Sequence, residues 1–327
     1  MKALLCKAYG PPDSLVVEEV AGVRPPEKGE VKIAVHASGL NFADTLMIAG
    51  KYQEKPPLPF SPGMECAGVI AEVGEGVTQL ARGDRVMAVT GHGGMAEEAI
   101  APAASVFRIP ASMSFEQAAA FPVVYGTVYY ALVDRGQLEA GETLLVHGAA
   151  GGVGSVAVEM GKLLGASVIA TAGSEEKLQL AKRLGADHAI NYSTHNVKDA
   201  VKALTREGVD VVFDPVGGDV FDQTLRAIAP EARILVIGFA SGRIPAIPAN
   251  ILLVKNCAVI GVYWGGFTRR DAGRNRANFE TMLRWFEEGK LRPPIVTRYR
   301  LEDAGEAMTA LLERRSTGKL VVATRDG

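Results

Sequence analysis

The residue whose type and setting most require a chemical explanation is Glu65, in the segment FSPGMECAGVI at residues 60–70. It stands between two glycines at the start of an apolar run that is typical of a strand, where a charge is rarely placed without a partner. A metal ion is one possible partner. However, the neighbouring Met64 offers only a thioether, which is a poor ligand for a hard or borderline ion. The first question is therefore which kind of site holds Glu65.

A second set of residues with chemical potential is the loop HGAAGGVGS at residues 147–155, which lies between an apolar strand and a helical segment. Gly151 and Gly152 let a diphosphate approach the backbone, Gly154 lets the helix pack close to the strand, and the helix N-terminus offers free N–H groups to the anion. Ala149 replaces the first glycine of the G-x-G-x-x-G fingerprint, so the strict pattern fails. The strand–turn–helix context still predicts a dinucleotide site, with a chance glycine-rich turn as the alternative.

The end of the second strand indicates which nicotinamide dinucleotide is used. An acidic residue there would bind the adenosine ribose diol and repel a 2′-phosphate. The sequence has Gly173 and Ser174 instead, followed by Lys177, and this small, hydroxyl-bearing turn favours NADPH over NADH. Glu175 and Glu176 count against this, unless they open the next helix, where its dipole stabilises them.

The composition limits the classes of function. A chain of 327 residues is too long for one ordinary core, so two domains are expected. Its 35 Lys and Arg residues balance 37 Asp and Glu residues, which gives no electrostatic reason to bind nucleic acid or an anionic membrane. We therefore expect a small-molecule partner.

Cysteine usage and the N-terminus indicate the compartment. Cys6, Cys66 and Cys257 lie far apart and form no CxxC pair, so neither a disulfide framework nor a thiolate zinc site is indicated. The apolar run before Lys7 is too short for a signal peptide, and no later uncharged run reaches about 18 apolar residues. We expect a soluble, cytoplasmic protein.

The sequence pattern changes along the chain. Up to about residue 110, short runs such as Val31, Ile33 and Val35 alternate with polar residues between glycine and proline turns, which predicts a mainly antiparallel β domain. From about residue 143, apolar strands such as TLLVH and SVIAT alternate with helical segments that end in glycine. About six such strands predict an α/β fold with a doubly wound parallel sheet.

The last segment is expected to return to the first domain. It contains a charged helix over 275–288, the strand IVTRYR over 295–300, a short helix over 303–314 and a last strand over 319–324. The predicted division is therefore 1–122 for a β catalytic domain, 123–263 for a nucleotide-binding domain and 264–327 for the return to the catalytic domain.

Several motifs in one order carry a family resemblance over nearly the whole chain. They are PGMECAG (62–68), GEGVTQLARGDRV (74–86), HGAAGGVG (147–154), FDPVGGDVF (213–221) and STGK (316–319). This order resembles the medium-chain dehydrogenase/reductase superfamily, and NFADTLMIAGKY with AAGGVG resembles its zinc-independent quinone oxidoreductases, the zeta-crystallin group. The resemblance implies a GroES-like β catalytic domain and a Rossmann domain that binds NADPH.

The zinc alcohol dehydrogenases of the same superfamily provide the comparison for Glu65. Asn41 stands where those enzymes place a catalytic cysteine, and Met64 stands for the histidine of their Gly-His-Glu motif. The four-cysteine structural zinc loop is also missing, and His92 is the only histidine nearby, so we expect no metal site. Glu65 is then expected to be a structural carboxylate near the cofactor cleft, paired with an arginine such as Arg85 or Arg315.

Without a Lewis acid, simple alcohol oxidation is difficult, whereas hydride transfer from NADPH to an activated acceptor needs only alignment and a donor to the oxygen that gains charge. Asn41 and Tyr52 are the predicted catalytic residues, since the resembled family places the asparagine beside the nicotinamide and the tyrosine along the cleft. The alternatives are that Tyr52 is a packed aromatic and Asn41 a turn residue. Asp44 is expected to orient its neighbours.

The remaining contacts to the cofactor follow from the strand ends and from the family pattern. The predicted cofactor-binding residues are Asn41, Thr127, Ala150, Gly151, Gly152, Val153, Gly173, Ser174, Lys177, Tyr192, Gly217, Phe239, Ala240 and Lys319. Lys319 resembles the family's cofactor-proximal lysine. In the family, the last strand of the nucleotide domain, here about 257–262, pairs with its copy, so a homodimer is expected.

The main hypothesis is an NADPH-dependent reductase of quinones or α,β-unsaturated carbonyl compounds. The basic run from Arg269 to Arg276 leaves a second hypothesis open: it is either a solvated helix start, or it binds the phosphates of an acyl-CoA and makes the enzyme an enoyl-CoA-type reductase. A third hypothesis is a non-catalytic NADPH- and RNA-binding protein, as reported for some zeta-crystallins, and a fourth is a zinc-free carbonyl or alcohol dehydrogenase.

Overall fold

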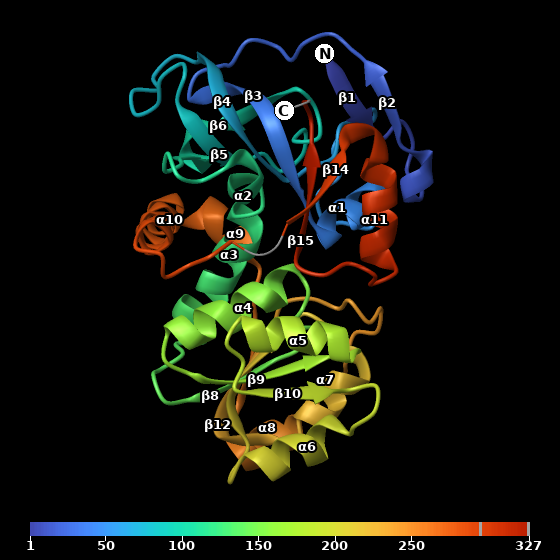
Figure 1. Cartoon of the computed structure of the whole chain (residues 1–327), viewed down its shortest axis with the longest axis vertical. Helices are drawn as coiled ribbons and strands as arrows, with labels where there is room; N and C mark the ends of the chain where they lie inside the picture. Colours follow the sequence, from blue (N-terminus) through green and yellow to red (C-terminus); the bar gives the residue numbers. More distant parts are fainter. Residues whose placement is uncertain (294–295, 326–327) are drawn as a thin grey trace. The chain divides into compact units, whose positions relative to one another are not determined.

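The computed structural model describes residues 1–293 and 296–325, which form two compact units (Figure 1). The first unit comprises Met1–Val124 and Ala272–Gly327, and the second comprises Tyr125–Asp271. The second boundary lies after residue 271 and not after the expected residue 263. The reason is that α9 (Trp264–Arg270) packs within the second unit, where Phe267 stacks on Tyr130 at 4.3 Å.

The first unit is built on a sheet of seven strands. Its order is β14 (Val296–Arg300), β15 (Lys319–Ala323), β3 (Glu30–Leu40), β4 (Glu65–Val73), β5 (Arg85–Val89) and β7 (Val106–Arg108), with β6 (Glu98–Pro102) also paired to β3. The C-terminal β15 pairs antiparallel with β3, with Leu320 opposite Leu40, and β3 pairs with β4, with Gly39 opposite Glu65. This register places the first residues of β15 and β4 beside the end of β3.

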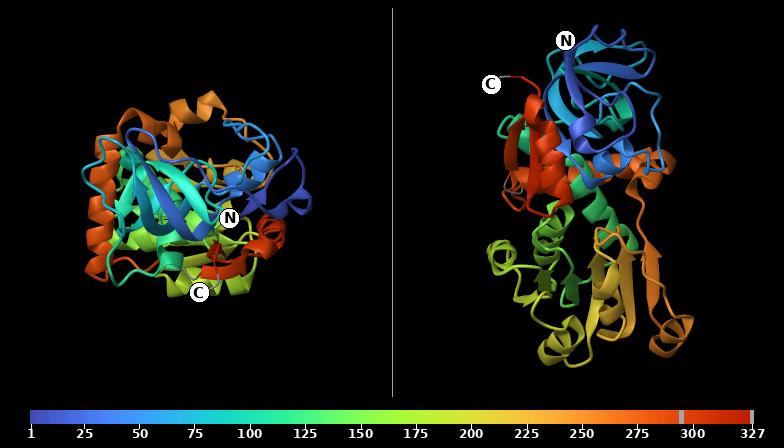
Figure 2. Two further views of the ribbon diagram at one scale, coloured as in Figure 1. Left: turned by 90° about the horizontal axis from the view of Figure 1, so that it is seen from above. Right: turned by 90° about the vertical axis from the view of Figure 1, so that its right-hand side faces the viewer.

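The first unit contains further elements beside this sheet. They are β1 (Lys2–Leu5), η1 (Pro12–Ser14), β2 (Val16–Glu19), α1 (Phe42–Ile48), η2 (Ala103–Ser105), α2 (Phe115–Ala119), α10 (Ala272–Glu287), η4 (Leu301–Asp303) and α11 (Ala304–Leu312). Both figures show α11 beside β14 (Figure 2). The expected strand over 295–300 began at Ile295, which lies outside the described residues.

The second unit is a doubly wound Rossmann-like domain, as predicted. Six parallel strands lie in the order β10 (His188–Asn191), β9 (Ser167–Ala172), β8 (Thr143–Val146), β11 (Val209–Asp214), β12 (Ile228–Val236) and β13 (Ala258–Gly261). The helices of this unit are α4 (Gly152–Leu163), α5 (Glu175–Arg183), α6 (Val197–Leu204), α7 (Gly218–Thr224), α8 (Ala249–Lys255) and α9, together with the later part of α3 (Pro122–Tyr129) and the π-helical turn η3 (Tyr130–Arg135).

Alternation along the strands sends successive side chains to the two faces of this sheet. Leu144 faces α4 so closely that a Cβ on Gly161 would lie 2.6 Å from Leu144 Cδ2. Leu145, the next residue, belongs to the cluster formed with Val201 of α6 and Phe221 of α7. Both faces are therefore buried, which explains why the strands read as continuous apolar runs. Among the described residues, no helix combines the length and apolarity needed to cross a membrane.

His147, directly after β8, is a fully buried histidine with two hydroxyl partners. Its Nδ1 lies 2.9 Å from Thr171 Oγ1 and its Nε2 lies 2.8 Å from Thr224 Oγ1. The Thr224 hydroxyl donates to the Val220 carbonyl, so it accepts from the ring, and the proton therefore lies on Nε2 while Nδ1 accepts from Thr171. The neutral imidazole thus ties β8 to β9 and α7 at the base of the glycine loop.

Burial lowers the pKa of His147 below its ordinary value of 6.5, and the nearby Asp214 carboxylate opposes this shift. Below pH 6.5 the unfolded chain therefore binds a proton that the folded chain does not. The contribution of His147 to stability should be complete above pH 6.5 and should be lost as the pH falls toward the folded pKa, with a slope of at most about 1.4 kcal/mol per pH unit.

We predict that His147→Gln, whose amide can both donate and accept, removes this component of the pH dependence. Urea unfolding of wild type and His147→Gln between pH 5 and 8 measures the free energy of unfolding of each protein. The difference between the two free energies should change with pH below pH 6.5 and stay constant above pH 6.5. His195→Gln, which replaces an exposed imidazole, is the control. Parallel pH profiles for wild type and His147→Gln would contradict the assignment.

Candidate active site

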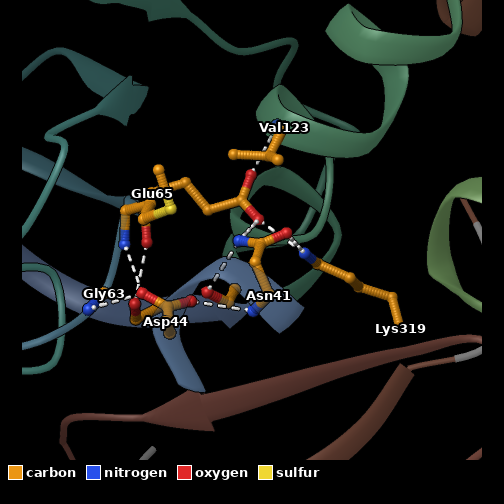
Figure 3. A network of polar contacts seen from close by, with 9 residues as sticks. Asn41, Asp44, Gly63, Glu65, Val123 and Lys319 are labelled. Carbon is orange, nitrogen blue, oxygen red and sulfur yellow. Dashed lines mark hydrogen bonds and ion pairs between the residues drawn. The ribbon is translucent and has the colours of Figure 1, made fainter. Parts of the chain in front are cut away.

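The centre of the candidate site is a buried cluster of Asn41, Glu65 and Lys319 in the first unit (Figure 3). Lys319 Nζ donates to Glu65 Oε1 at 2.6 Å and to Asn41 Oδ1 at 2.5 Å. Asn41 Nδ2 donates to Glu65 Oε1 at 2.8 Å. Glu65 is fully buried and Lys319 is only 2% exposed, so the two opposite charges compensate each other away from water.

These contacts correct the expectation for Glu65, whose cationic partner is Lys319 and not an arginine. Arg85 instead donates to the carbonyls of Ala111 and Met113, and Arg315 pairs with Glu313. Lys319 was expected to contact the cofactor directly. In the structure, its ammonium donates hydrogen bonds to two protein groups, the Asn41 amide oxygen and the Glu65 carboxylate. The predicted site residues Asn41 and Lys319 are therefore in direct contact, and both also contact Glu65.

The second oxygen of Glu65 reaches the start of α3. Glu65 Oε2 accepts a hydrogen bond from the Val123 backbone N–H at 2.7 Å. This N–H belongs to the first turn of α3, where backbone donors have no partner within the helix and a negative charge is favourable. One carboxylate thus holds two side chains and a helix N-terminus. The close approach depends on Gly39, because a Cβ there would lie 2.4 Å from Glu65 Oε1 and 2.3 Å from the Ala119 carbonyl oxygen.

Asp44 fixes the backbone around Asn41. Its Oδ2 accepts from the Asn41 N–H at 2.8 Å, and its Oδ1 accepts from the N–H groups of Gly63 and Met64 at 3.0 and 3.2 Å. Asn41 is the N-cap residue of α1. Burial raises the pKa of Asp44 to about 6, although these N–H donors and the Lys319 charge act in the opposite direction. Asp44 thus accepts three hydrogen bonds from backbone N–H groups, which makes it an orienting group.

Tyr52 and His92 lie in the first unit outside this cluster. Tyr52 is half-buried and packs against the hydrophobic cluster that includes Met47 and Met308. His92 makes an edge contact with Phe60, with ring centroids 6.4 Å apart, and burial lowers the pKa of its imidazole. No three His, Cys, Asp or Glu side chains within the described ranges 1–293 and 296–325 converge as metal ligands.

In the second unit, the loop between β8 and α4 has the backbone shape expected of an anion cradle. A Cβ on Gly154 would lie 2.1 Å from the Gly148 carbonyl oxygen, so this position must be glycine for the helix to begin so close to the strand. A Cβ on Gly151 would meet only that same oxygen, at 3.4 Å, and Gly151 is exposed. The backbone before α4 is therefore open on one side, beside the N-terminus of a helix of 12 residues.

The residues predicted to bind a 2′-phosphate also lie together. Gly173 faces the ring of Tyr192, since its Cβ would lie 3.1 Å from the tyrosine. Ser174 is the N-cap of α5 and accepts from the Lys177 N–H at 3.4 Å. Glu175 and Glu176 both lie in the first turn of α5. They therefore open this helix, where its dipole stabilises their negative charges. Lys177 is half-buried on the same turn.

Two further loops carry the remaining predictions for this unit. Gly217 has φ 66°, in the left-handed region, and packs against Phe239, whose Cδ1 would lie 3.2 Å from a Cβ at Gly217. The Ala240 N–H bonds the Pro215 carbonyl, which joins the loops after β11 and β12. Thr127 is half-buried on α3. The remaining members, Ala150, Gly151, Gly152 and Val153, form the turn into α4.

The basic run from Arg269 to Arg276 has intramolecular partners. Arg276 donates to backbone carbonyls including that of Val106 and lies over the Phe107 ring at 5.1 Å. Arg269 donates to the Tyr263 hydroxyl at 3.1 Å. Both ends of the run are thus engaged within the chain, which weakens the interpretation that it binds the phosphates of an acyl-CoA.

Three features of the structure are not predicted from the sequence. The glycine-loop pattern around His147 does not indicate that its ring binds the hydroxyls of Thr171 and Thr224. Asp214 accepts from the N–H groups of Val216 and Gly217 at 2.7 and 2.9 Å. These bonds form a turn, which an Asp followed by Pro-Val-Gly could have indicated. The bond from Val123 to Glu65 carries no sequence signal.

Comparison with known proteins identifies the superfamily to which the two domains belong. Residues 27–111 match the alcohol dehydrogenase GroES-like domain, and residues 152–288 match the family described as zinc-binding dehydrogenase. A quinone oxidoreductase-like protein 2 homolog of Nematostella vectensis is 45% identical over 99% of this chain and 89% of its own. The chain therefore belongs to the medium-chain dehydrogenase/reductase superfamily.

Solved structures narrow the assignment. A Pseudomonas syringae quinone oxidoreductase is similar with a TM-score of 0.92 at 35% identity, covering 98% of this chain and 99% of that one. An Escherichia coli quinone oxidoreductase complexed with NADPH has the same TM-score at 30% identity, covering 99% and 100%. Within the superfamily, the chain belongs to the quinone oxidoreductase family.

Proposed function

We propose that this chain is an NADPH-dependent oxidoreductase that transfers a hydride to a quinone or to the β-carbon of an α,β-unsaturated carbonyl compound. The observation that carries the proposal is the glycine cradle before α4, open at Gly151 and closed by backbone at Gly154. The names of the similar proteins, one of them complexed with NADPH, support the same assignment. When bound, NADPH supplies the hydride and leaves as NADP⁺, while a proton from water completes the reduction of the acceptor.

The residues of the second unit fit this cofactor. The turn Ala150–Val153 would hold the diphosphate with its backbone N–H groups. Gly173, Ser174, Lys177 and Tyr192 would hold the 2′-phosphate, because they combine a small turn, a hydroxyl, a cation and a phenol in one place. Thr127, Gly217, Phe239 and Ala240 are proposed along the nicotinamide half.

In the first unit, Asn41 and Tyr52 are proposed to donate hydrogen bonds to the acceptor oxygen that gains negative charge. A neutral donor suffices there because the acceptor is already activated. We propose that no metal takes part. The donors that a metal would use at Asn41 and Glu65 already face the Lys319 ammonium, so a cation at this place would have to displace another cation.

We also propose a cytoplasmic location. The three cysteines are all free thiols, and two of them, Cys6 and Cys66, are buried. Burial raises the pKa of Cys66 to about 12, so its thiol stays protonated and inert. Reduced, unpaired cysteines are typical of a reducing compartment.

The function is tested by offering NADPH with 1,4-benzoquinone, a 2-alkenal and a short enoyl-CoA separately and by following the loss of NADPH absorbance. We expect turnover with the quinone or the alkenal. The rate should stay the same after dialysis against a chelator, and mass spectrometry should measure the zinc content before and after this treatment. Turnover with the enoyl-CoA alone would favour the acyl-CoA hypothesis. Silence with all three acceptors, or loss of turnover together with loss of stoichiometric zinc, would reject the proposal.

We predict that Lys177→Met raises the KM for NADPH about tenfold and leaves the KM for NADH nearly unchanged, because one charged contact to the 2′-phosphate is lost. Steady-state kinetics with both cofactors measure the ratio. Lys182→Met on the same helix removes an equal charge from the last turn, where Lys182 lies near Glu175, and serves as the control. An equal effect on both cofactors would contradict the assignment.

A homodimer through the edge strand β13 is also proposed. In the described sheet β13 pairs only with β12, and its other edge is unpaired. On the neighbouring α8, Leu253 and Val254 are 78% and 79% exposed, which is unusual for apolar side chains of this size.

We predict that the double substitution Leu253→Glu with Val254→Glu converts a dimer to a monomer, as measured by size-exclusion chromatography with light scattering. Leu204→Glu on α6 is the control, and a monomeric wild type would refute the dimer.

A further inference from the structure

The Asn41 side-chain amide is held at both ends by charged groups. Its oxygen accepts from the Lys319 ammonium at 2.5 Å, and its nitrogen donates to the Glu65 carboxylate at 2.8 Å. The second contact of the nitrogen, to the Gly39 carbonyl, is long at 3.4 Å. One amide hydrogen is therefore firmly bonded, and the other is held only weakly.

The two charges permit only one orientation of this amide. Rotation by a half turn would place the NH₂ group against the ammonium and the oxygen against the carboxylate, and both contacts would then be repulsive. The oxygen and the nitrogen of an asparagine amide have nearly the same shape, so only the chemistry of the partners decides which faces which. Charge-assisted hydrogen bonds of this kind are about twice as strong as neutral ones.

The same charges also change the donor strength of the amide. An ammonium on the oxygen withdraws electron density from the amide, and this makes the N–H groups better donors. Asn41 is 8% exposed, whereas Lys319 is 2% exposed and Glu65 is fully buried. Of the three groups, Asn41 is the one with a surface available to a ligand.

We infer that Lys319 and Glu65 are positioning residues, which act on the reaction through the Asn41 amide and not through contact with the cofactor. This inference rests on the proposed function, and it replaces the expectation of Lys319 as a cofactor ligand with a different role. Lys319 orients and polarises the amide, and Glu65 fixes the nitrogen that donates to the acceptor oxygen. A merely structural ion pair would stabilise the fold without coupling to Asn41 during turnover.

A double-mutant cycle separates these roles. We expect Lys319→Met to lower kcat by about a hundredfold, a usual cost of losing one oxyanion donor, with little change in the KM for NADPH. Asn41→Ala should have a similar effect, and the double variant should be no slower than Asn41→Ala alone, because both act through one group. Lys319→Arg, which keeps a cation, should restore part of the activity. Additive losses, or a raised KM for NADPH in Lys319→Met, would overturn the inference.

A variant that leaves Glu65 buried without a counter-charge can fail to fold, so a charge-balanced pair is included. Glu65→Gln with Lys319→Met removes both charges together, and it should fold but remain as slow as Asn41→Ala. Wild-type turnover in this folded pair would overturn the inference.

The last measurement does not depend on activity. Selective ¹⁵N-asparagine labelling gives a side-chain amide signal for Asn41, assigned by its loss in Asn41→Ala. It should be protected from solvent exchange in wild type and should shift in Lys319→Met. An unshifted signal would overturn the inference. A shifted signal in a protein that reduces no acceptor would show that Lys319 does act on the Asn41 amide but that the proposed function is wrong.

Discussion

The first unit depends on the compensation of one buried charge. Glu65 is fully buried, and it accepts hydrogen bonds from the Lys319 ammonium, the Asn41 amide and the Val123 N–H. These donors come from the last strand, from the turn after β3 and from the start of α3. Removal of one partner of a buried ion pair typically costs about 3–5 kcal/mol, because the other charge stays uncompensated. The cluster therefore fixes how three distant segments meet, and with them the setting of Asn41.

The sequence predicted the parts of the fold that depend on local patterns. Alternating apolar runs and glycine stops were enough for the doubly wound sheet, and the strand–turn–helix context located the glycine loop. The partner of Glu65 could not be found in this way, because Lys319 lies 254 residues further along the chain. Only the antiparallel pairing of β15 with β3 brings it to that place, and no spacing rule encodes such a pairing. An arginine was expected, whereas the partner is a lysine, a compact point charge with three hydrogen-bond donors.

His147 shows the same limit in the second unit. A histidine before a glycine loop has no periodic signal, and its role appears only when β9 and α7 supply the hydroxyls of Thr171 and Thr224. Both cases obey one rule, which is that a buried polar group must find partners. The sequence shows that Glu65 and His147 require partners, but the identity of those partners is a property of the tertiary structure.

The choice of an ammonium as the partner of Glu65 bears on the chemistry. An ammonium offers hydrogen-bond donors but no coordination position, so it can orient a neutral amide but cannot act on an alkoxide as a Lewis acid, as a zinc ion does. Asn41 and Met64 are consistent with such a site, since neither provides a good ligand for zinc. An acceptor that needs only a modest donor, such as a quinone or an enone, matches an oriented amide. An unactivated alcohol, which needs its oxygen charge stabilised much more strongly, does not. Under the proposed function, the buried ion pair therefore favours acceptors that need only a neutral hydrogen-bond donor.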